Sequence, residues 1–215
     1  MRHKMAGRNI WRKAGFSRSS STSLGPRDIG RMGAITTVYT ALRLRGLQRS
    51  GDVLAALHAV QDMDDVDRDN LFLAGWSHGG WTLMDLFTLD LANDAPAGLV
   101  DVDPEALSRI RGVLLVYPFC GVITRSTSDA WHTEIDTLMI TGGRDTVAPA
   151  RSCEQAAERL NGNGSSIEWV QFDEATHAFD VNIKELFQRG EYNEDLTQEA
   201  RDQAVEFFRA RMLQP

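Results

Sequence analysis

The sequence has few cysteines and no long apolar run, and each shortage excludes a class of protein. Its only cysteines are Cys120 and Cys153, too few for a small secreted domain held together by several disulfides. No stretch approaches the roughly 18 consecutive apolar residues of a membrane-spanning helix, and no apolar segment of the signal-peptide type is found. We therefore expect a cytoplasmic protein that has no disulfide framework and does not bind a membrane.

Basic residues are scarce outside the beginning of the chain. Residues 1–31 contain eight Arg and Lys residues against one acid, whereas the other 15 basic residues stand against 29 acidic ones. An acidic body argues against a groove for nucleic acid, so no nucleic-acid partner is expected. The basic beginning by itself is consistent with a nucleic-acid-binding tail or with an Arg- and Ser-rich transit peptide.

Short apolar runs alternate with helical patterns from residue 47 onward. The predicted strands are 71–74, 113–117, 138–140 and 167–172, and the predicted helices are 47–62, 81–91, 151–160 and 200–213. This alternation is typical of a parallel sheet with helices on both faces. Residues 1–30 show neither a helical nor a strand period. We therefore expect an irregular basic N-terminal segment (1–30) followed by one α/β domain (31–215).

A candidate nucleophile, Ser77, follows the first predicted strand in the pattern Gly75-x-Ser77-x-Gly79. Such a nucleophile elbow lifts the serine hydroxyl above the carboxyl edge of the sheet. The flanking glycines let the strand and the next helix approach without a Cβ clash. The pattern would occur by chance about 0.1 times in a chain of this length. Its position between an apolar strand and an amphipathic helix is what favours a catalytic role.

A serine hydroxyl needs a base to take its proton, and His177 is the histidine best placed to act as that base. It follows the predicted strand 167–172, and ligands of open α/β sheets bind at the carboxyl ends of strands. The other histidines are less well placed. His3 lies in the unpatterned beginning and His58 within a predicted helix. His78 lies beside the serine and His132 in a polar loop.

Asp145 is the carboxylate expected to orient His177. It lies just past the predicted strand 138–140, and the chain order Ser77, Asp145, His177 is that of α/β-hydrolases. Taken alone, a carboxylate at this position is as often a cap of its own loop as a member of a triad. The triad is favoured because all three residues are expected at the same edge of the sheet. Three rival acids share the histidine's loop, where solvated loop charges are the commoner role: Asp173, Glu174 and Asp180.

The chain from Gly30 onward resembles the dienelactone hydrolase (carboxymethylenebutenolidase-like) family of the α/β-hydrolase superfamily. The matching motifs are Gly75-Trp76-Ser77-His78-Gly79-Gly80, Tyr117-Pro118, Gly142-Gly143-Arg144-Asp145 and Thr176-His177-Ala178-Phe179. The best-known members use a cysteine nucleophile, whereas this elbow holds serine, as in prolyl-oligopeptidase-like esterases. The resemblance implies a three-layer α/β/α sandwich with a mostly parallel sheet. It also implies hydrolysis of a small-molecule ester or lactone through an acyl-enzyme, without metal or organic cofactor.

The same resemblance suggests roles for residues around the triad. The backbone N–H of His78 would donate to the oxyanion, since it lies at the start of the helix that follows the elbow. Four further residues are candidates for the lining of the acyl pocket, with ordinary core packing as an equal alternative for each: Trp76, Tyr117, Phe119 and Cys120.

The resemblance also implies three or four strands before the helix at 47–62, but only about 46 residues precede it and none has the pattern of a buried strand. We expect an N-terminally incomplete fold without these strands and without the second oxyanion donor that they supply. Loss of one such donor costs on the order of 10²–10³ in rate. Strand 71–74 would then have an open apolar edge, through which a homodimer is conceivable.

The residues at the beginning of the chain suggest a reason why the expected strand pattern is missing there. A polar run, Ser17-Arg18-Ser19-Ser20-Ser21-Thr22, stands where the family has an apolar, valine-rich strand. GTC valine codons read one base late become TCG serine codons. We hypothesise that residues 1 to about 22 derive from a shifted frame or a mis-assigned start.

Three functions remain open from the sequence. The intact triad favours a serine ester or lactone hydrolase. The missing strands favour a truncated or degenerate hydrolase with little or no catalysis. A prolyl-oligopeptidase-like peptidase is a third alternative, although nothing in the sequence resembles the propeller domain of those enzymes.

Overall fold

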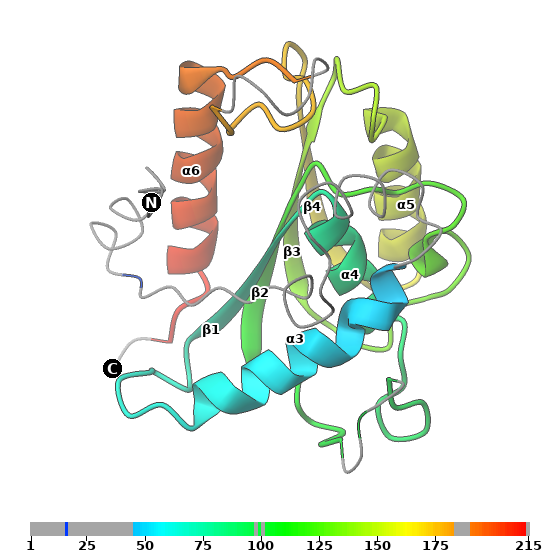
Figure 1. Cartoon of the computed structure of the whole chain (residues 1–215), viewed down its shortest axis with the longest axis vertical. Coiled ribbons are helices and arrows are strands. Elements are labelled where there is room, and N and C mark those ends of the chain that lie inside the picture. The colour runs from blue at the N-terminus through cyan, green and yellow to red at the C-terminus, as the bar shows by residue number, and fades with distance from the viewer. Residues whose placement is uncertain (1–15, 17–44, 97–98, 100–101, 183–189, 214–215) are drawn as a thin grey trace, which may run out of the picture.

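The computed structural model describes residue 16 and residues 45–96, 99, 102–182 and 190–213 (Figure 1). Apart from Phe16, the predicted N-terminal segment 1–30 and the first part of the predicted domain lie outside the described residues. The hypothesis about residues 1 to about 22 falls there as well.

Within the described residues, four parallel strands form a sheet and follow one another across it in chain order. They are β1 (Leu71–Trp76), β2 (Ile110–Val116), β3 (Asp136–Gly142) and β4 (Ser166–Phe172). Each predicted strand is present and begins at or before the residue predicted for it. Because all four run the same way, their carboxyl ends share one edge of the sheet. The predicted parallel α/β fold is confirmed.

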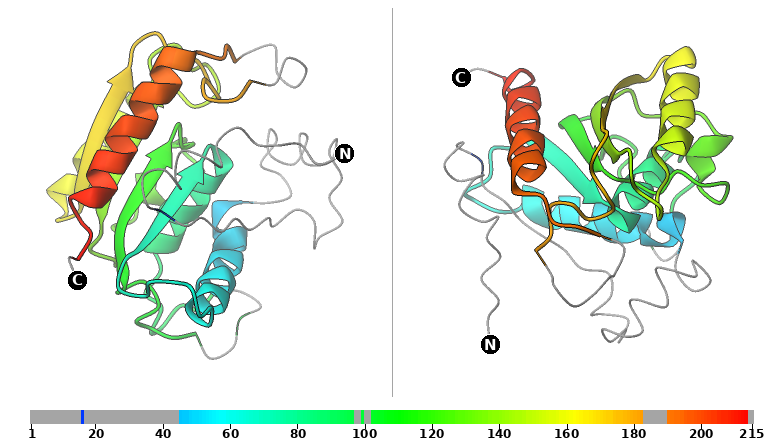
Figure 2. Two further views of the ribbon diagram at one scale, coloured as in Figure 1. Left: turned by 90° about the vertical axis from the view of Figure 1, so that its left-hand side faces the viewer. Right: turned by 90° about the horizontal axis from the view of Figure 1, so that it is seen from above.

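Helices cover both faces of this sheet (Figures 1 and 2). On one face lie α3 (Gly46–Gln61), α4 (His78–Phe87) and α5 (Ala150–Gly162), and on the other lies α6 (Glu194–Arg209). Side chains alternate along β2, so that Val113 and Leu115 join the core beneath the three helices. Leu114 and Val116 join the core beneath α6. The described part of the chain is therefore a three-layer α/β/α sandwich.

Two predicted helices differ from the observed ones at their ends. Helix α4 begins directly after Ser77 and ends at Phe87, where the Thr88 hydroxyl donates to the Asp85 carbonyl oxygen. Helix α6 begins at Glu194, six residues before the predicted start, because the side chain of Asn193 accepts a hydrogen bond from the Leu196 N–H. This cap precedes a polar first turn that has no apolar period, so the pattern of apolar residues missed it.

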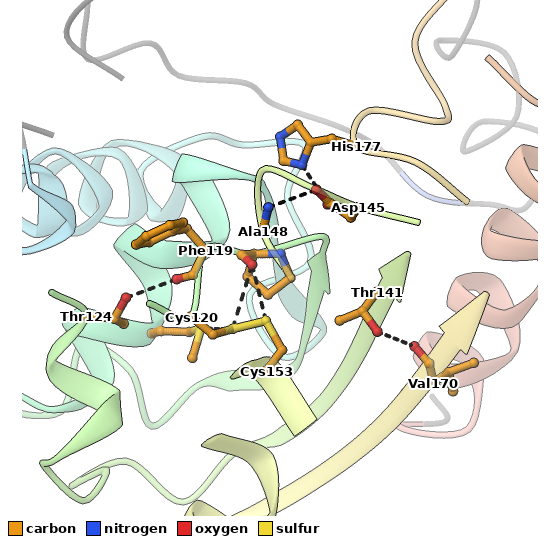
Figure 3. The surroundings of a disulfide bond; sticks show 11 residues. Phe119, Cys120, Thr124, Thr141, Asp145, Ala148, Cys153, Val170 and His177 are labelled. Carbon is orange, nitrogen blue, oxygen red and sulfur yellow. Dashed lines mark hydrogen bonds and ion pairs between the residues drawn. A yellow bond between two sulfur atoms is a disulfide. The ribbon is translucent and has the colours of Figure 1, made fainter. Parts of the chain in front are cut away.

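The two cysteines form a disulfide, Cys120–Cys153 (Figure 3). The expectation that they would not pair is wrong, since the fold brings together two buried residues that are 33 apart in sequence. The bond joins the loop after β2 to helix α5. The expectation of a cytoplasmic protein rested in part on the absence of a disulfide framework and loses that support. Within the described ranges, no helix combines the length and apolar character that crossing a membrane requires.

Removing this disulfide should lower the free energy of unfolding by about 3–4 kcal/mol, the loop-closure entropy for a loop of this size. Urea titrations of the oxidised protein and of the Cys120→Ala/Cys153→Ala variant would measure the difference. The reduced wild type is the matched control, because it breaks the bond without changing side-chain volume beyond the two thiol hydrogens. Equal stability of the oxidised and reduced wild type would contradict the prediction.

Asp85 of helix α4 is a buried carboxylate that holds two other segments. Its oxygens accept hydrogen bonds from the backbone N–H groups of Leu47, in the first turn of α3, and of Arg125, at 3.0 and 2.9 Å. Arg125 begins a 3₁₀ helix, Arg125–Thr127. Burial, which outweighs these hydrogen bonds, raises the pKa of Asp85 to about 6. The folded protein therefore holds the proton of Asp85 more tightly than the unfolded chain does.

This raised pKa predicts a loss of stability as pH rises. The contribution of Asp85 is fully present below its unfolded pKa of about 3.9 and is lost as pH passes through about 6, a total of about 3 kcal/mol. Urea titrations at pH 4 and pH 7 of the wild type and of Asp85→Asn would isolate the effect. The wild type should lose more stability between these pH values than the variant. An identical pH dependence in both proteins would refute the prediction.

Candidate active site

Ser77 occupies a sharp turn between β1 and α4. Its backbone angles are φ 49° and ψ −117°, in a region that non-glycine residues rarely adopt. The turn is held on both sides: the Ser77 N–H donates to the carbonyl oxygen of Val116 at 3.0 Å, and the Ser77 carbonyl oxygen accepts from the Trp81 N–H at 3.1 Å. The strained backbone and its supports place Ser77 above the carboxyl edge of the sheet, as the elbow pattern predicts.

This turn leaves no room for a side chain at Gly75 or Gly80. A Cβ on Gly75 would lie 2.7 Å from backbone atoms of Gly79 and Gly80, and one on Gly80 would lie 2.8 Å from Pro118 Cβ. A Cβ on Gly79 would meet no atom of the described residues within 4 Å. Of the two glycines in the pattern, only Gly75 is therefore required by close packing among the described residues. The backbone of Gly79 is what Gly75 must approach.

Three side chains meet at the carboxyl ends of three strands. Ser77 Oγ lies 3.0 Å from Nε2 of His177, and Nδ1 of His177 lies 2.7 Å from Oδ2 of Asp145. Ser77 follows β1, Asp145 follows β3, and His177 follows β4. The carboxylate of Asp145 is fully buried, whereas the imidazole of His177 is 14% exposed. The arrangement gives a hydroxyl, an imidazole and a shielded carboxylate in one hydrogen-bonded row. Figure 3 shows the contact between His177 and Asp145 in this row.

The carboxylate of Asp145 is fixed by its own loop. Its Oδ1 accepts hydrogen bonds from the backbone N–H groups of Val147 and Ala148, both at 2.8 Å; Figure 3 shows the contact with Ala148. This loop packs tightly against the loop of the histidine, because a Cβ on Gly143 would lie 2.5 Å from the carbonyl oxygen of Asp173. With Oδ1 occupied, Oδ2 is the oxygen that faces His177.

The three rival acids do not contact His177 in any hydrogen bond or ion pair described. Asp173 accepts from the side chain of Gln171, and Glu174 lies 3.6 Å from Arg144 in an exposed ion pair. Asp180 is different from the solvated loop charge that we expected. Its oxygens accept hydrogen bonds from the Trp76 indole and the Tyr117 hydroxyl. Sequence reasoning missed this contact because its partners lie at the ends of other strands.

The four predicted pocket residues lie in different surroundings. Trp76 is 36% exposed beside the elbow, and the ring of Tyr117 is buried with its centroid 4.9 Å from that of His177. Phe119 is half-buried and lies 5.3 Å from the Trp81 ring. Cys120 is buried within the core and bonded to Cys153. The core alternative therefore holds for Cys120, because a disulfide-bonded core sulfur offers no pocket surface.

His78 begins helix α4 directly after Ser77, so its backbone N–H belongs to the helix N-terminus. Its imidazole is buried. Nδ1 lies 2.8 Å from a guanidinium nitrogen of Arg49, and the ring packs at a tilt of 45° against Trp81, with centroids 4.8 Å apart. Because arginine always donates, Nδ1 accepts and the ring proton is on Nε2. Within the described segments, no group of three or more His, Cys, Asp or Glu residues is arranged to hold a metal ion.

Solved structures of known proteins share this fold. A candidate dienelactone hydrolase from Klebsiella pneumoniae subsp. pneumoniae MGH 78578 gives a TM-score of 0.60 at 14% identity, over 86% of this chain and 69% of that one. Thermogutta terrifontis esterase 2, phosphorylated by paraoxon, gives 0.57 at 22% identity, over 80% and 67%. Its propionate-bound form gives 0.57 at 17% identity, over 78% and 66%. The chain thus spans about two thirds of the length of these proteins.

The sequence itself matches a family. No curated protein matches it, but the profile of the dienelactone hydrolase family matches residues 30–212. This range contains all three strand ends that carry Ser77, Asp145 and His177. It confirms the resemblance expected from Gly30 onward. The chain belongs to the dienelactone hydrolase family.

Proposed function

We propose that this protein is a serine hydrolase that cleaves a carboxylic ester or lactone through an acyl-enzyme on Ser77. The single observation that carries the proposal is the hydrogen-bonded row Ser77–His177–Asp145, with contacts of 3.0 and 2.7 Å. Both distances are within reach for proton transfer and for orientation of the base. Family membership supports the reaction class.

The row supports acylation in the following way. Nε2 of His177 takes the proton of Ser77 as Oγ attacks the substrate carbonyl carbon. Asp145 stabilises the imidazolium that forms and keeps the proton of the neutral ring on Nδ1, so that Nε2 is free to accept. The imidazolium then gives its proton to the leaving alcohol. For a lactone, this alcohol stays attached to the acyl group.

Negative charge on the carbonyl oxygen develops at the N-terminus of α4. There the backbone N–H of His78 can donate to it, and the positive end of the helix dipole favours the same charge. We expect from the sequence that the second donor of the family is missing, and the part of the chain before α3 that bears on this lies outside the described residues. Deacylation reverses the roles, with water as the nucleophile and His177 again as the base.

The substrate is proposed to be a small ester or lactone. Trp76 directly precedes Ser77, Phe119 packs against Trp81 of helix α4, and both aromatic side chains keep accessible area. Aromatic lining favours apolar acyl groups over charged ones. A series of p-nitrophenyl esters of increasing acyl length would locate the limit of this pocket. The peptidase alternative has no observation in its favour.

Labelling with a fluorophosphonate tests the proposal, because this probe reacts with activated serine hydroxyls. The folded wild type should be labelled on Ser77, and Ser77→Ala should not. Ser128→Ala is the matched control, since Ser128 is an exposed loop serine that should not affect labelling. A folded wild type without label would favour the degenerate-hydrolase alternative, and label on another residue would refute Ser77 as the nucleophile.

A further inference from the structure

One carboxylate, that of Asp180, connects the ends of three strands. It lies three residues after His177, in the loop that follows β4. Oδ2 accepts a hydrogen bond from the indole N–H of Trp76 at 2.9 Å, and Oδ1 accepts from the hydroxyl of Tyr117 at 2.5 Å. Trp76 is the last residue of β1 and Tyr117 directly follows β2. Asp180 thus links the loop of His177 to the ends of β1 and β2.

Tyr117 is held in an unusual conformation that brings its ring against the base. Its φ is 38°, a left-handed value that a tyrosine rarely adopts. The ring is buried, and its centroid lies 4.9 Å from that of His177 with an interplanar angle of 60°. Burial, followed by the charge of Asp180, raises the pKa of the Tyr117 hydroxyl well above its usual value. The hydroxyl therefore stays protonated and donates to Asp180 throughout the working pH range.

The hydrogen bond to Asp145 fixes only one end of the imidazole. A ring held at Nδ1 alone can still tilt about that bond, and tilting moves Nε2 away from Ser77. The ring of Tyr117 packs against the imidazole and restricts this tilt. Misplacement of a reacting group by about 1 Å can cost 10²-fold in rate. Whatever fixes the ring of Tyr117 therefore also fixes Nε2.

We propose that Asp180 is a positioning residue for His177 and acts through Tyr117. This inference rests on the proposed function, because positioning matters only if His177 is the base. Asp180 accepts from the Tyr117 hydroxyl at the far end of the ring from the backbone, so the ring is tied at both ends. The bond to Trp76 anchors the same carboxylate to the strand that carries the nucleophile. Asp145 then controls the tautomer of His177, and Asp180 controls its tilt.

Kinetics of Asp180 and Tyr117 variants with p-nitrophenyl acetate test the proposal. Asp180→Ala should lower kcat by about 10- to 100-fold and change KM by no more than about two-fold. Tyr117→Phe, which keeps the ring and removes the hydroxyl, should have a similar effect. The double variant should be no worse than the more impaired single one, because both changes remove the same restraint. Asp180→Asn keeps one accepting oxygen and should recover most of the rate.

Asp173→Ala is the matched control, since Asp173 lies in the same loop and its carboxylate bonds, among the described residues, only the side chain of Gln171. It should leave kcat unchanged. If Asp180→Ala does not fold, Tyr117→Phe still decides the question. Unchanged kcat in folded Asp180→Ala or Tyr117→Phe would overturn the proposal, and so would losses that multiply in the double variant.

A second measurement separates this proposal from the proposed function. The Nδ1 proton shared between His177 and Asp145 should give a downfield proton NMR signal in the wild type, whether or not the protein turns over ester. The signal should broaden in Asp180→Ala and Tyr117→Phe and stay sharp in Asp173→Ala. A wild type that gives the signal but shows no turnover and no label would refute the proposed function alone. A signal equally sharp in all variants would refute the positioning role.

Discussion

Replacing Ser77 with alanine is expected to lower kcat for p-nitrophenyl acetate by about 10⁵-fold, and His177→Ala should do the same. Losses of roughly this size follow removal of the nucleophile or the base from a serine-hydrolase triad. Ser77 Oγ and His177 Nε2 are 3.0 Å apart and act as one unit. The hydroxyl without its base is a poor nucleophile, and the base without the hydroxyl has no proton to take.

The double variant should therefore be no slower than either single one. Residues that act as a unit lose their combined effect once one of them is removed. Steady-state rates of the three variants and the wild type, after removal of any wild-type contamination, would give the comparison. The fold should be retained in each, because both changes shorten side chains at the sheet edge rather than in its core. Losses that multiply would show that the two residues act independently.

Asp145→Asn should lower kcat by about 10⁴-fold through a change of tautomer. Oδ1 of Asp145 accepts from two backbone N–H groups, those of Val147 and Ala148. The amide oxygen of the asparagine must take that place, which turns its NH₂ group toward Nδ1 of His177. Nδ1 then accepts, the ring proton moves to Nε2, and His177 can no longer take the proton of Ser77.

Nitrogen-15 NMR of the His177 ring tests this reason as well as the rate. The variant should show the proton on Nε2, whereas the neutral wild-type ring should carry it on Nδ1. Asp136→Asn is the matched control. Asp136 is the first residue of β3, at the end of the strand far from Asp145, and it pairs with Arg211. A kcat of Asp145→Asn within ten-fold of the wild type would contradict the role given to Asp145.

Much of the fold could be predicted from the sequence because the signals are local. The apolar runs at 71–74 and 138–140 lie within the observed strands β1 and β3, and the helical pattern at 47–62 corresponds to α3 within one residue at each end. Helix ends were less predictable. The start of α6 depends on a side-chain cap at Asn193, which an apolar period does not report.

The positions of Ser77, Asp145 and His177 could be predicted for a related reason. Each lies in the turn or loop that follows a strand, and a parallel sheet brings strand ends to one edge whatever the details of packing. No comparable rule of topology predicts which other distant segments come into contact. The disulfide Cys120–Cys153 and the bonds of Asp180 join segments far apart in the chain, so no spacing in the sequence indicates them.

Chemical trapping of the acyl-enzyme tests the central claim most directly. Wild-type protein mixed with p-nitrophenyl acetate and quenched in acid during turnover should carry one acetyl group. Peptide mass spectrometry should locate this group on Ser77. Ser77→Ala, treated in the same way, should carry none. Ester turnover by the wild type without acetylation of Ser77, or with the acetyl group on another residue, would contradict the claim.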